Sequence, residues 1–233
     1  MSKFNPVIIF ANAYDCKPAI EALEKIDCDQ LHINYYPYPT NYHKAEEFLE
    51  EHPEYTHLFY VAPDIVLDEF VWDMMCQYVK ENDPAVYGCC CNVDTDKYSD
   101  SLACCLTLPT LEYDTRNYRW LKESQRQDAL SRGWKVIPVK FNANLAFVKT
   151  SIKKCFKYMS IPVQKDVRPI HEQEGGFACD LALCHQFDYS GIEVLVDLRY
   201  KVKHLRYAGE LLVGKITPNT KFIKKHKAQN VND

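Results

Sequence analysis

Glycine, and the sequence motifs built on it, are scarce in this chain. Only 7 of its 233 residues are glycine, and the sequence contains neither GxGxxG nor GxxxxGK[ST]. The phosphate-binding loops of dinucleotide-dependent enzymes and of P-loop NTPases are therefore excluded. GxSxG and HExxH are also missing, which excludes the α/β-hydrolase nucleophile and the helical zinc-protease motif.

Long apolar runs and an excess of positive charge are missing too. The net charge is -4 and the sequence pI is about 6.1, so we expect no nucleic-acid partner, because binding to phosphates needs surplus Lys and Arg. The N-terminal run at 7–11 (VIIFA) is too short for a signal-peptide core, and no segment approaches the ~20 apolar residues that cross a bilayer. We therefore expect a cytoplasmic protein.

Cysteine is abundant, but it lacks the spacing of known cysteine sites. None of the 11 cysteines forms a CxxC pair, which excludes a zinc ribbon or a thioredoxin motif. Most lie in apolar runs, where reduced Cys acts as a small buried hydrophobe. A metal site built from Cys89, Cys91 and Cys104 remains a minor alternative.

The first third of the chain alternates strand and helix patterns. Apolar runs predict strands at 6–11, 30–35, 56–62 and 85–91, and amphipathic stretches predict helices at 16–26, 40–51 and 68–81. We expect Asp15 to cap the first helix. This order predicts an α/β domain with a mostly parallel sheet flanked by helices.

The pattern changes after residue 91. We expect a hairpin through 92–107, a polar helix, two strands around the sequence FNAN, two further helices and two final strands; the ranges are 118–132, 134–140, 145–149, 151–158, 178–187, 192–196 and 199–205. Residues 1–210 are expected to form one domain. The extension 211–233 is Lys-rich and is expected to lack regular structure; it either solubilises the chain or contacts anionic lipid at a membrane surface.

Three side chains follow predicted strands or open a helix where chemistry could occur. Asp64 follows the third strand, where a carboxylate can bind a divalent ion, or it simply starts a turn. Asp180 opens a helix and could act as a general base, with Glu172 and Glu174 as alternates, or it is an ordinary helix-start acid. His204 follows a strand and could bind a metal or a diphosphate, or it is merely packed.

Taken in order, these features resemble the GT-A glycosyltransferases, close to family-two-like members. That family has an Asp-x-Asp motif after an apolar strand, which resembles LFYVAPD ending at Asp64. Its later acid pair, Gly, apolar strand, Asp and His resemble Cys179-Asp180, Gly191, IEVLV, Asp197 and His204. The resemblance spans residues 5–207 and implies a Rossmann-like GT-A fold.

Two positions depart from the family pattern. Ala62 replaces the first Asp of Asp-x-Asp, which affects ribose contact and metal affinity, and Cys179 replaces the usual Glu. A literal Asp-x-Asp occurs at Asp94 and Asp96, in a polar turn. It stays open as a rival metal site.

The resemblance also implies a donor-binding site and a mechanism. Asp64 and His204 would hold Mn²⁺ or Mg²⁺ on the diphosphate of a nucleoside diphosphate sugar, and Asp180 would deprotonate the hydroxyl acceptor, giving inversion. A retaining outcome stays open, because it depends on geometry that the sequence does not show. The acceptor would be a glycan, a protein or a lipid-linked hydroxyl. Besides Asp64, the donor-binding residues would be Ala11, Asn12, Tyr14, Tyr36, His43, Lys44, Asn142 and Asn144.

Two other functions stay open. A sugar nucleotidylyltransferase would share the layout, but the chain lacks the glycine-rich N-terminal loop that such an enzyme needs. A non-catalytic protein that binds carbohydrate or a partner on a decayed GT-A scaffold is favoured by Ala62 and Cys179.

Overall fold

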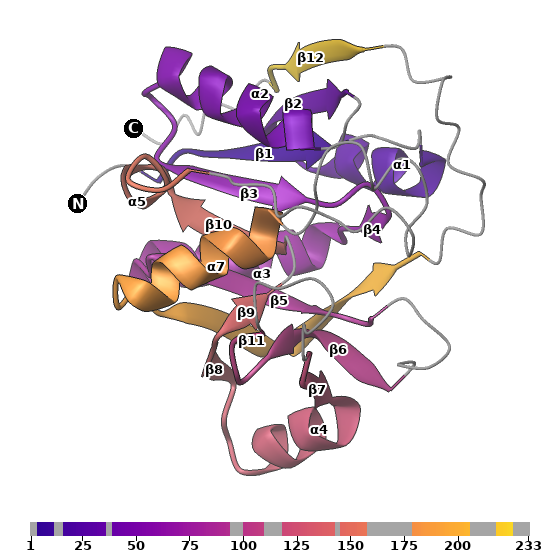
Figure 1. Cartoon of the computed structure of the whole chain (residues 1–233). Coiled ribbons are helices and arrows are strands. Elements are labelled where there is room, and N and C mark those ends of the chain that lie inside the picture. The colour runs from indigo at the N-terminus through magenta and orange to yellow at the C-terminus, as the bar shows by residue number, and fades with distance from the viewer. Residues whose placement is uncertain are drawn as a thin grey trace, which may run out of the picture.

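The described part of the chain is built around one nine-stranded mixed sheet with a small three-stranded sheet beside it (Figure 1). The computed structural model describes residues 4–11, 16–35, 39–93, 100–109, 118–142, 145–157, 179–205 and 218–225. The fold is mixed α/β, as the sequence predicts.

The first half of the chain follows the predicted alternation closely. Its elements are β1 (Pro6–Ala11), α1 (Lys17–Lys25), β2 (Asp29–Asn34), α2 (Pro39–Glu51), β3 (His57–Val61), β4 (Ile65–Val66), α3 (Glu69–Asn82) and β5 (Val86–Cys91). α3 begins where it does because the Asp68 carboxylate accepts hydrogen bonds from the backbone N–H groups of Phe70 and Val71. The predicted cap of α1 is wrong: the N-cap residue is Cys16, whose side chain makes no capping bond, and Asp15 lies outside the described residues.

The second half departs more from expectation. Its elements are β6 (Ser101–Cys105), β7 (Trp120–Lys122), α4 (Glu123–Ser131), β8 (Val136–Val139), β9 (Phe141–Asn142), β10 (Leu145–Lys149), α5 (Thr150–Lys153), α7 (Cys179–Tyr189), β11 (Val194–His204) and β12 (Asn219–Ile223). The helix predicted from 118 starts only at Glu123, because residues 120–122 pair with β6. The two last predicted strands form a single strand, β11, with an irregularity between Asp197 and Lys201.

The C-terminal extension takes part in the sheet. β12, which lies in the Lys-rich segment, pairs antiparallel with β2. The expectation that this segment lacks regular structure is therefore wrong for residues 219–223. Residues 219–223 form a strand because they pair with β2. Local composition does not reveal such pairing between distant segments.

The predicted strand directions are also wrong in part. The order of the large sheet is β12-β2-β1-β3-β10-β5-β11-β4, with β8 also on β11. Pairings of β1 with β2 and β3, and of β5 with β11, are parallel. The other five, β3–β10, β10–β5, β11–β4, β11–β8 and β2–β12, are antiparallel. Most of the antiparallel pairings involve strands from the second half of the chain, which inserts β10 between β3 and β5.

Helices cover both faces of the sheet, as expected. Alternate residues of β1 point to opposite sides: Val7 and Ile9 pack in a cluster that includes side chains of α2 and α7, while Ile8 and Phe10 pack with side chains of α1 and α3. β1 and β3 are buried at every position, which explains why both read as continuous apolar runs.

The cysteines mostly fill this core. Ten are described as free, and all of these except Cys155 are buried. Within the part of the chain that the structure describes, no three His, Cys, Asp or Glu residues are placed to hold a metal. The alternative metal site at Cys89, Cys91 and Cys104 is therefore wrong.

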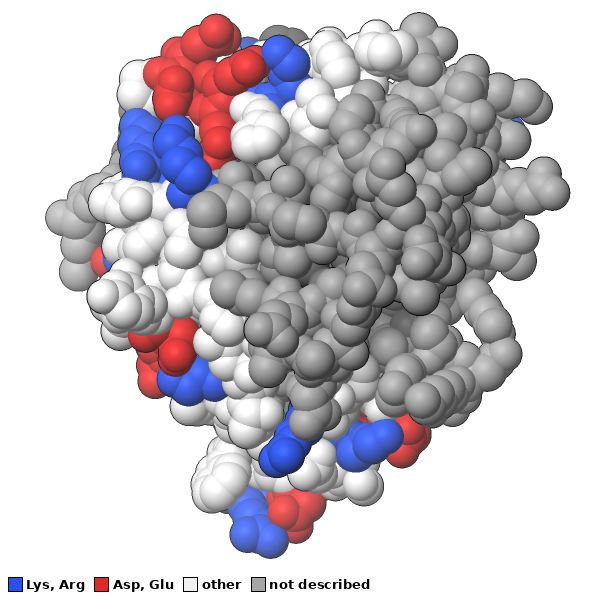
Figure 2. Space-filling view, viewed as in Figure 1, with Lys and Arg blue, Asp and Glu red and all other residues white. Residues whose placement is uncertain are grey.

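The surface carries both signs of charge close together. Figure 2 shows acidic groups over α2 beside basic groups near α5, and pairs such as Lys153–Glu46 at 2.7 Å and Lys157–Glu50 at 3.3 Å join the two. No helix among the described residues has the length and apolar character needed to cross a membrane.

A buried histidine at the start of β3 makes stability sensitive to acid. The His57 side chain is 4% exposed, its Nε2 has no hydrogen-bond partner, and its ring lies 5.0 Å from that of Phe4. Burial first, and then the charge of Lys149, lowers the pKa of His57 to about 4. The neutral ring is thus the folded form.

We expect acid to weaken the fold through this group. The unfolded chain takes up the proton near pH 6.5, so the contribution of His57 is complete above pH 6.5 and is lost as the pH falls towards 4, by up to about 3 kcal/mol. His57→Phe should reduce the loss of unfolding free energy between pH 7 and pH 4.5, measured by urea denaturation. Equal losses in variant and wild type would contradict this.

Candidate functional site

The carboxyl ends of parallel strands meet at one edge of the sheet. β1 runs parallel to β3, and β5 runs parallel to β11. Antiparallel β10 joins the two halves, and its first residue Leu145 lies opposite Val61, the last residue of β3. Ligands of open α/β sheets bind at such edges, so the polar groups there are the candidate site.

Asp64 and His204 meet at this edge although they are 140 residues apart in the chain. His204 Nε2 lies 3.0 Å from Asp64 Oδ2. The backbone holds the pair: β4 and the end of β11 are paired, with Ile65 opposite His204, and the Leu205 N–H donates to the Asp64 carbonyl at 2.8 Å. Both side chains are partly exposed, 17% for Asp64 and 19% for His204, and so remain accessible to a ligand.

The hydrogen bonds of His204 require a cation or proton between these two side chains. His204 Nδ1 lies 2.8 Å from the backbone carbonyl oxygen of Asn92, which only accepts, so Nδ1 carries a hydrogen. A neutral imidazole then has a lone pair at Nε2, facing an oxygen of a carboxylate. One proton must therefore lie between Nε2 and Oδ2, and a metal ion could take its place.

Two cysteines line the same corner but are unsuited to metal binding. Cys16 and Cys91 are both buried, at the start of α1 and the end of β5. Burial raises the pKa of each thiol, and the nearby negative charge of Asp64 raises it further. Because the thiolate is the ligating form, these neutral thiols act as walls of the site.

Asp180 lies at the same edge, in the first turn of α7. α7 packs against β9, whose Asn142 Nδ2 donates to the Leu145 carbonyl at the start of β10 at 3.4 Å. Burial raises the pKa of Cys184 in α7 to about 12; a hydrogen bond with the Asn142 backbone lowers this pKa, and the negative charge of Asp180 raises it. Asp180 precedes Cys184 by one helical turn. Its Oδ1 accepts from the Leu181 N–H at 2.9 Å, as suits an acid at a helix start.

Asn142 has a packing role. Its side chain is 7% exposed and lies against β5 at Gly88, where an added Cβ would stand 2.3 Å from Asn142 Nδ2 and 2.3 Å from the Leu145 carbonyl oxygen. Glycine at position 88 therefore lets β9 and β10 approach β5. The hypothesis that Asn142 contacts a donor sugar is untested, and this burial favours the turn-forming role.

The other described residues that we expect to bind the sugar donor are not gathered around Asp64 and His204. Ala11 ends β1 and is fully buried, so it offers no exposed surface to a donor. α2 begins at Pro39, so His43 and Lys44 lie beyond its first turn. The N-terminus of the helix is therefore not placed to help these two residues bind phosphate. Lys44 Nζ lies 2.6 Å from Glu47, and His43 Nδ1 lies 3.5 Å from Glu46. The remaining predicted residues, and both alternates for Asp180, lie outside the described part: Asn12, Tyr14, Tyr36, Asp94, Asp96, Asn144, Glu172 and Glu174.

The sequence marks Asp197 only through the family resemblance and does not predict the buried network around it. Asp197 in β11 is 0% exposed; it accepts from the Tyr87 hydroxyl at 2.5 Å and from Arg199 Nη2 at 2.6 Å. Burial, followed by the hydrogen bond to Asp197, raises the pKa of Tyr87, and the same carboxylate raises the pKa of Arg199. The one sequence signal for the Asp197–Arg199 pair is an Asp that follows an apolar strand pattern. Nothing in the sequence marks the Asn92 carbonyl that orients His204.

Comparisons with known proteins add little to these contacts. No protein-family model matches the chain. No curated protein matches it either. Among solved structures, the chain is similar to A197 from STIV, with a TM-score of 0.48 and 10% identity, over 88% of this chain and 83% of A197. A likeness at this level carries no inference about function, so the function must be argued from the residues above.

Proposed function

We propose that the chain is a GT-A-type glycosyltransferase that moves a sugar from a nucleoside diphosphate sugar to a hydroxyl acceptor. The observation that carries the proposal is the Asp64–His204 contact of 3.0 Å at the carboxyl edge of the sheet. A carboxylate and an imidazole from distant segments, both partly exposed, meet where α/β folds bind ligands. The sequence resemblance assigns these two residues to the metal.

The donor set suits an ion that completes its coordination with substrate. Mg²⁺ keeps several waters and is usually held by one or two protein groups plus phosphates, in an octahedron with bonds of about 2.1 Å. Neighbouring ligands of such an octahedron are about 3.0 Å apart, from the same bond length, which matches the spacing of Nε2 and Oδ2. Mn²⁺ or Mg²⁺ bound there would neutralise the charge that develops on the diphosphate leaving group.

Within this proposal Asp180 is the general base. A carboxylate in the first turn of α7 stays ionised, because the helix N-terminus favours negative charge. It would orient the acceptor hydroxyl and accept its proton, while the oxygen attacks the anomeric carbon from the face opposite the diphosphate. That arrangement gives inversion. The acceptor class (glycan, protein or lipid-linked hydroxyl) is not narrowed by these contacts.

A specific observation favours one alternative, a non-catalytic binding protein on the same scaffold. Asp64 and His204 already contact one another directly, and Ala62 supplies no second carboxylate. A proton between them would then be permanent, and nucleotide diphosphates would bind without metal or not at all.

The deciding experiment is a thermal-shift panel with UDP, GDP, CDP and their sugars, each with Mn²⁺ and with EDTA. Wild type should be stabilised by one nucleotide family only when Mn²⁺ is present, by about 2.7 kcal/mol at a ligand concentration of 100 Kd. Asp64→Ala should lose this effect. Asp73→Asn, which removes an exposed acid on α3, is the control and should keep it.

Either of two results would overturn the proposal. No shift with any nucleotide would favour the binding protein. A shift that persists in EDTA would show that the diphosphate is recognised without the ion, and the role of His204 as a ligand would be lost. Cytoplasmic location, absence of a nucleic-acid partner and membrane contact through the Lys-rich segment remain separate predictions.

A further inference from the structure

A cavity that includes neither Asp64 nor His204 lies between α4, β7 and β8. Its volume is about 730 Å³, which is in the range of pockets that enclose small organic ligands. Leu198 of β11 contributes to its wall. Leu198 precedes His204 by six residues along β11, and neither Asp64 nor His204 is among the residues that line the pocket.

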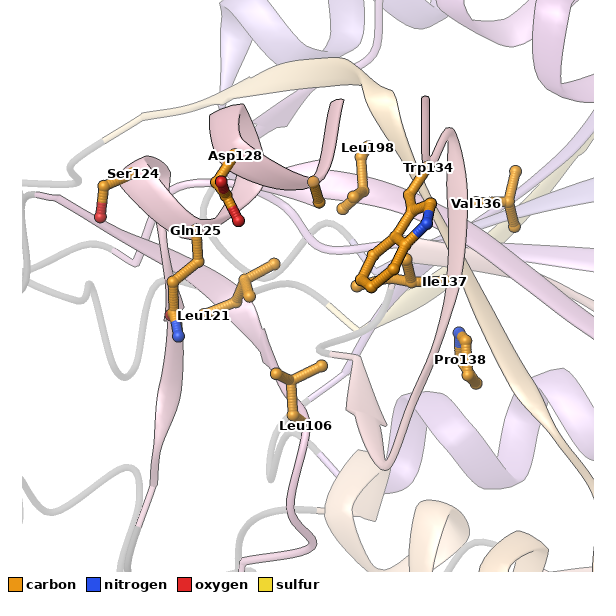
Figure 3. A pocket seen from close by; sticks show the side chains of 11 residues that line it. Leu106, Leu121, Ser124, Gln125, Asp128, Trp134, Val136, Ile137, Pro138 and Leu198 are labelled. Carbon is orange, nitrogen blue, oxygen red and sulfur yellow. The ribbon is translucent and has the colours of Figure 1, made fainter. Parts of the chain in front are cut away.

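Most of the wall is apolar. Leu106, Leu121, Val136, Ile137 and Leu198 surround the space, and Figure 3 shows the Trp134 ring at its side, opposite α4. Trp134 is 57% exposed and Leu106 is 47% exposed. Large apolar side chains left open to water around one cavity are typical of ligand-binding surfaces.

The opposite wall is polar but carries no free charge. α4 lines the pocket with Ser124, Gln125 and Asp128. The Asp128 carboxylate is paired with Arg132 at 3.0 Å, and Gln125 Oε1 accepts from the Lys122 backbone N–H at 2.9 Å. Among the described residues, the Ser124 hydroxyl and the Gln125 amide N–H₂ have capacity left, which suits a neutral hydroxyl on the ligand.

We propose that this pocket binds an uncharged amphiphile, with an aliphatic chain along the Leu, Val, Ile and Trp134 wall and a hydroxyl head at Ser124 and Gln125. A free sugar fits less well, because most of its hydroxyls would face apolar side chains and lose their hydrogen bonds. The inference does not depend on the glycosyltransferase proposal, since the two sites share no residue.

The first test is a homologous series of 1-hexanol, 1-octanol and 1-decanol, titrated into the wild-type chain by calorimetry. Each added methylene should tighten Kd by about fourfold, the fold-change that corresponds to about 0.8 kcal/mol, and glucose should not bind. A Kd that does not depend on chain length would overturn the proposal, as would binding of glucose in preference to the alkanols.

The second test places the ligand in this pocket. Ala129→Phe fills the cavity from α4 and should weaken 1-decanol binding at least tenfold, whereas Gln127→Phe puts the same ring on the exposed side of α4 and should leave it unchanged. Trp134→Ala, at an exposed position that the fold tolerates, should also weaken binding. Unchanged affinity in both Ala129→Phe and Trp134→Ala would overturn the assignment, even if the chain-length dependence holds.

Discussion

Replacing Asp64 with Asn is expected to remove metal-dependent nucleotide binding while leaving the fold intact. Asn keeps the shape of Asp, and its amide N–H can donate to a neutral His204 Nε2 across the existing 3.0 Å contact. The ion, however, loses the carboxylate that the proposal assigns to it. Because changes even to outer-shell groups cost about 10–100-fold in metal affinity, we expect Mn²⁺ binding to weaken by at least about 100-fold.

The measurement is a calorimetric titration of Mn²⁺ in the presence of the nucleotide that the panel identifies. In two buffers of different ionisation enthalpy, wild type should release close to one proton per ion, because the metal replaces the proton between Nε2 and Oδ2. His204→Gln should give the same loss of affinity as Asp64→Asn. If either variant binds Mn²⁺ like wild type, the ion is held elsewhere, and Asp94 with Asp96 becomes the site to test.

Removing the Asp197 carboxylate is expected to be the most destabilising single change in the described core. The group is fully buried, and it holds the Tyr87 hydroxyl on β5 and Arg199 at the irregularity of β11. Asp197→Ala leaves both partners without their acceptor inside the sheet. Breaking a fully buried ion pair costs about 3–5 kcal/mol, and because Arg199 is partly exposed, we expect a cost of about 3 kcal/mol.

We expect the midpoint of thermal unfolding to fall by roughly 10 °C, at about 2–4 °C per kcal/mol for a chain of this size. Tyr87→Phe is the matched control, since it deletes one hydrogen bond of the network but keeps the charge pair, at a cost of about 1 kcal/mol. A fall in Asp197→Ala no larger than that in Tyr87→Phe would mean that Arg199, whose side chain is 34% exposed, is satisfied by water.

The sequence predicts helices and strands well where the hydrophobic pattern of a short segment determines them. β1 was predicted with its observed bounds, because a continuous apolar run is what a strand buried on both faces requires. α3 follows from its amphipathic repeat, and the structure adds the cap at Asp68. Strand partners cannot be predicted in this way. The sequence LAFVK of β10 is the same whether the strand runs parallel or antiparallel to β3, so the sequence does not predict that β10 lies antiparallel between β3 and β5.

The candidate site was predicted only as separate residues. The sequence placed Asp64 and His204 after strands, but their contact depends on β4 pairing with the end of β11. The role of Asn92 is carried by its backbone carbonyl, which has no signature in the residue type. Asn142 shows the converse, since its position within FNAN suggests ligand contact, whereas its burial reflects the close approach that Gly88 allows.

The two lateral strands of the large sheet bear on self-association. An unpaired sheet edge is a template for another chain, and lysine or proline there opposes such pairing. β12 carries Lys221 next to β2, and Lys225 is fixed nearby, its backbone N–H donating to Asp29 at 2.8 Å. On the other side, β8 contains the exposed Pro138, which has no N–H to offer. Lys221 on β12 and Pro138 on β8 are therefore residues of the kinds that oppose edge-to-edge pairing of sheets.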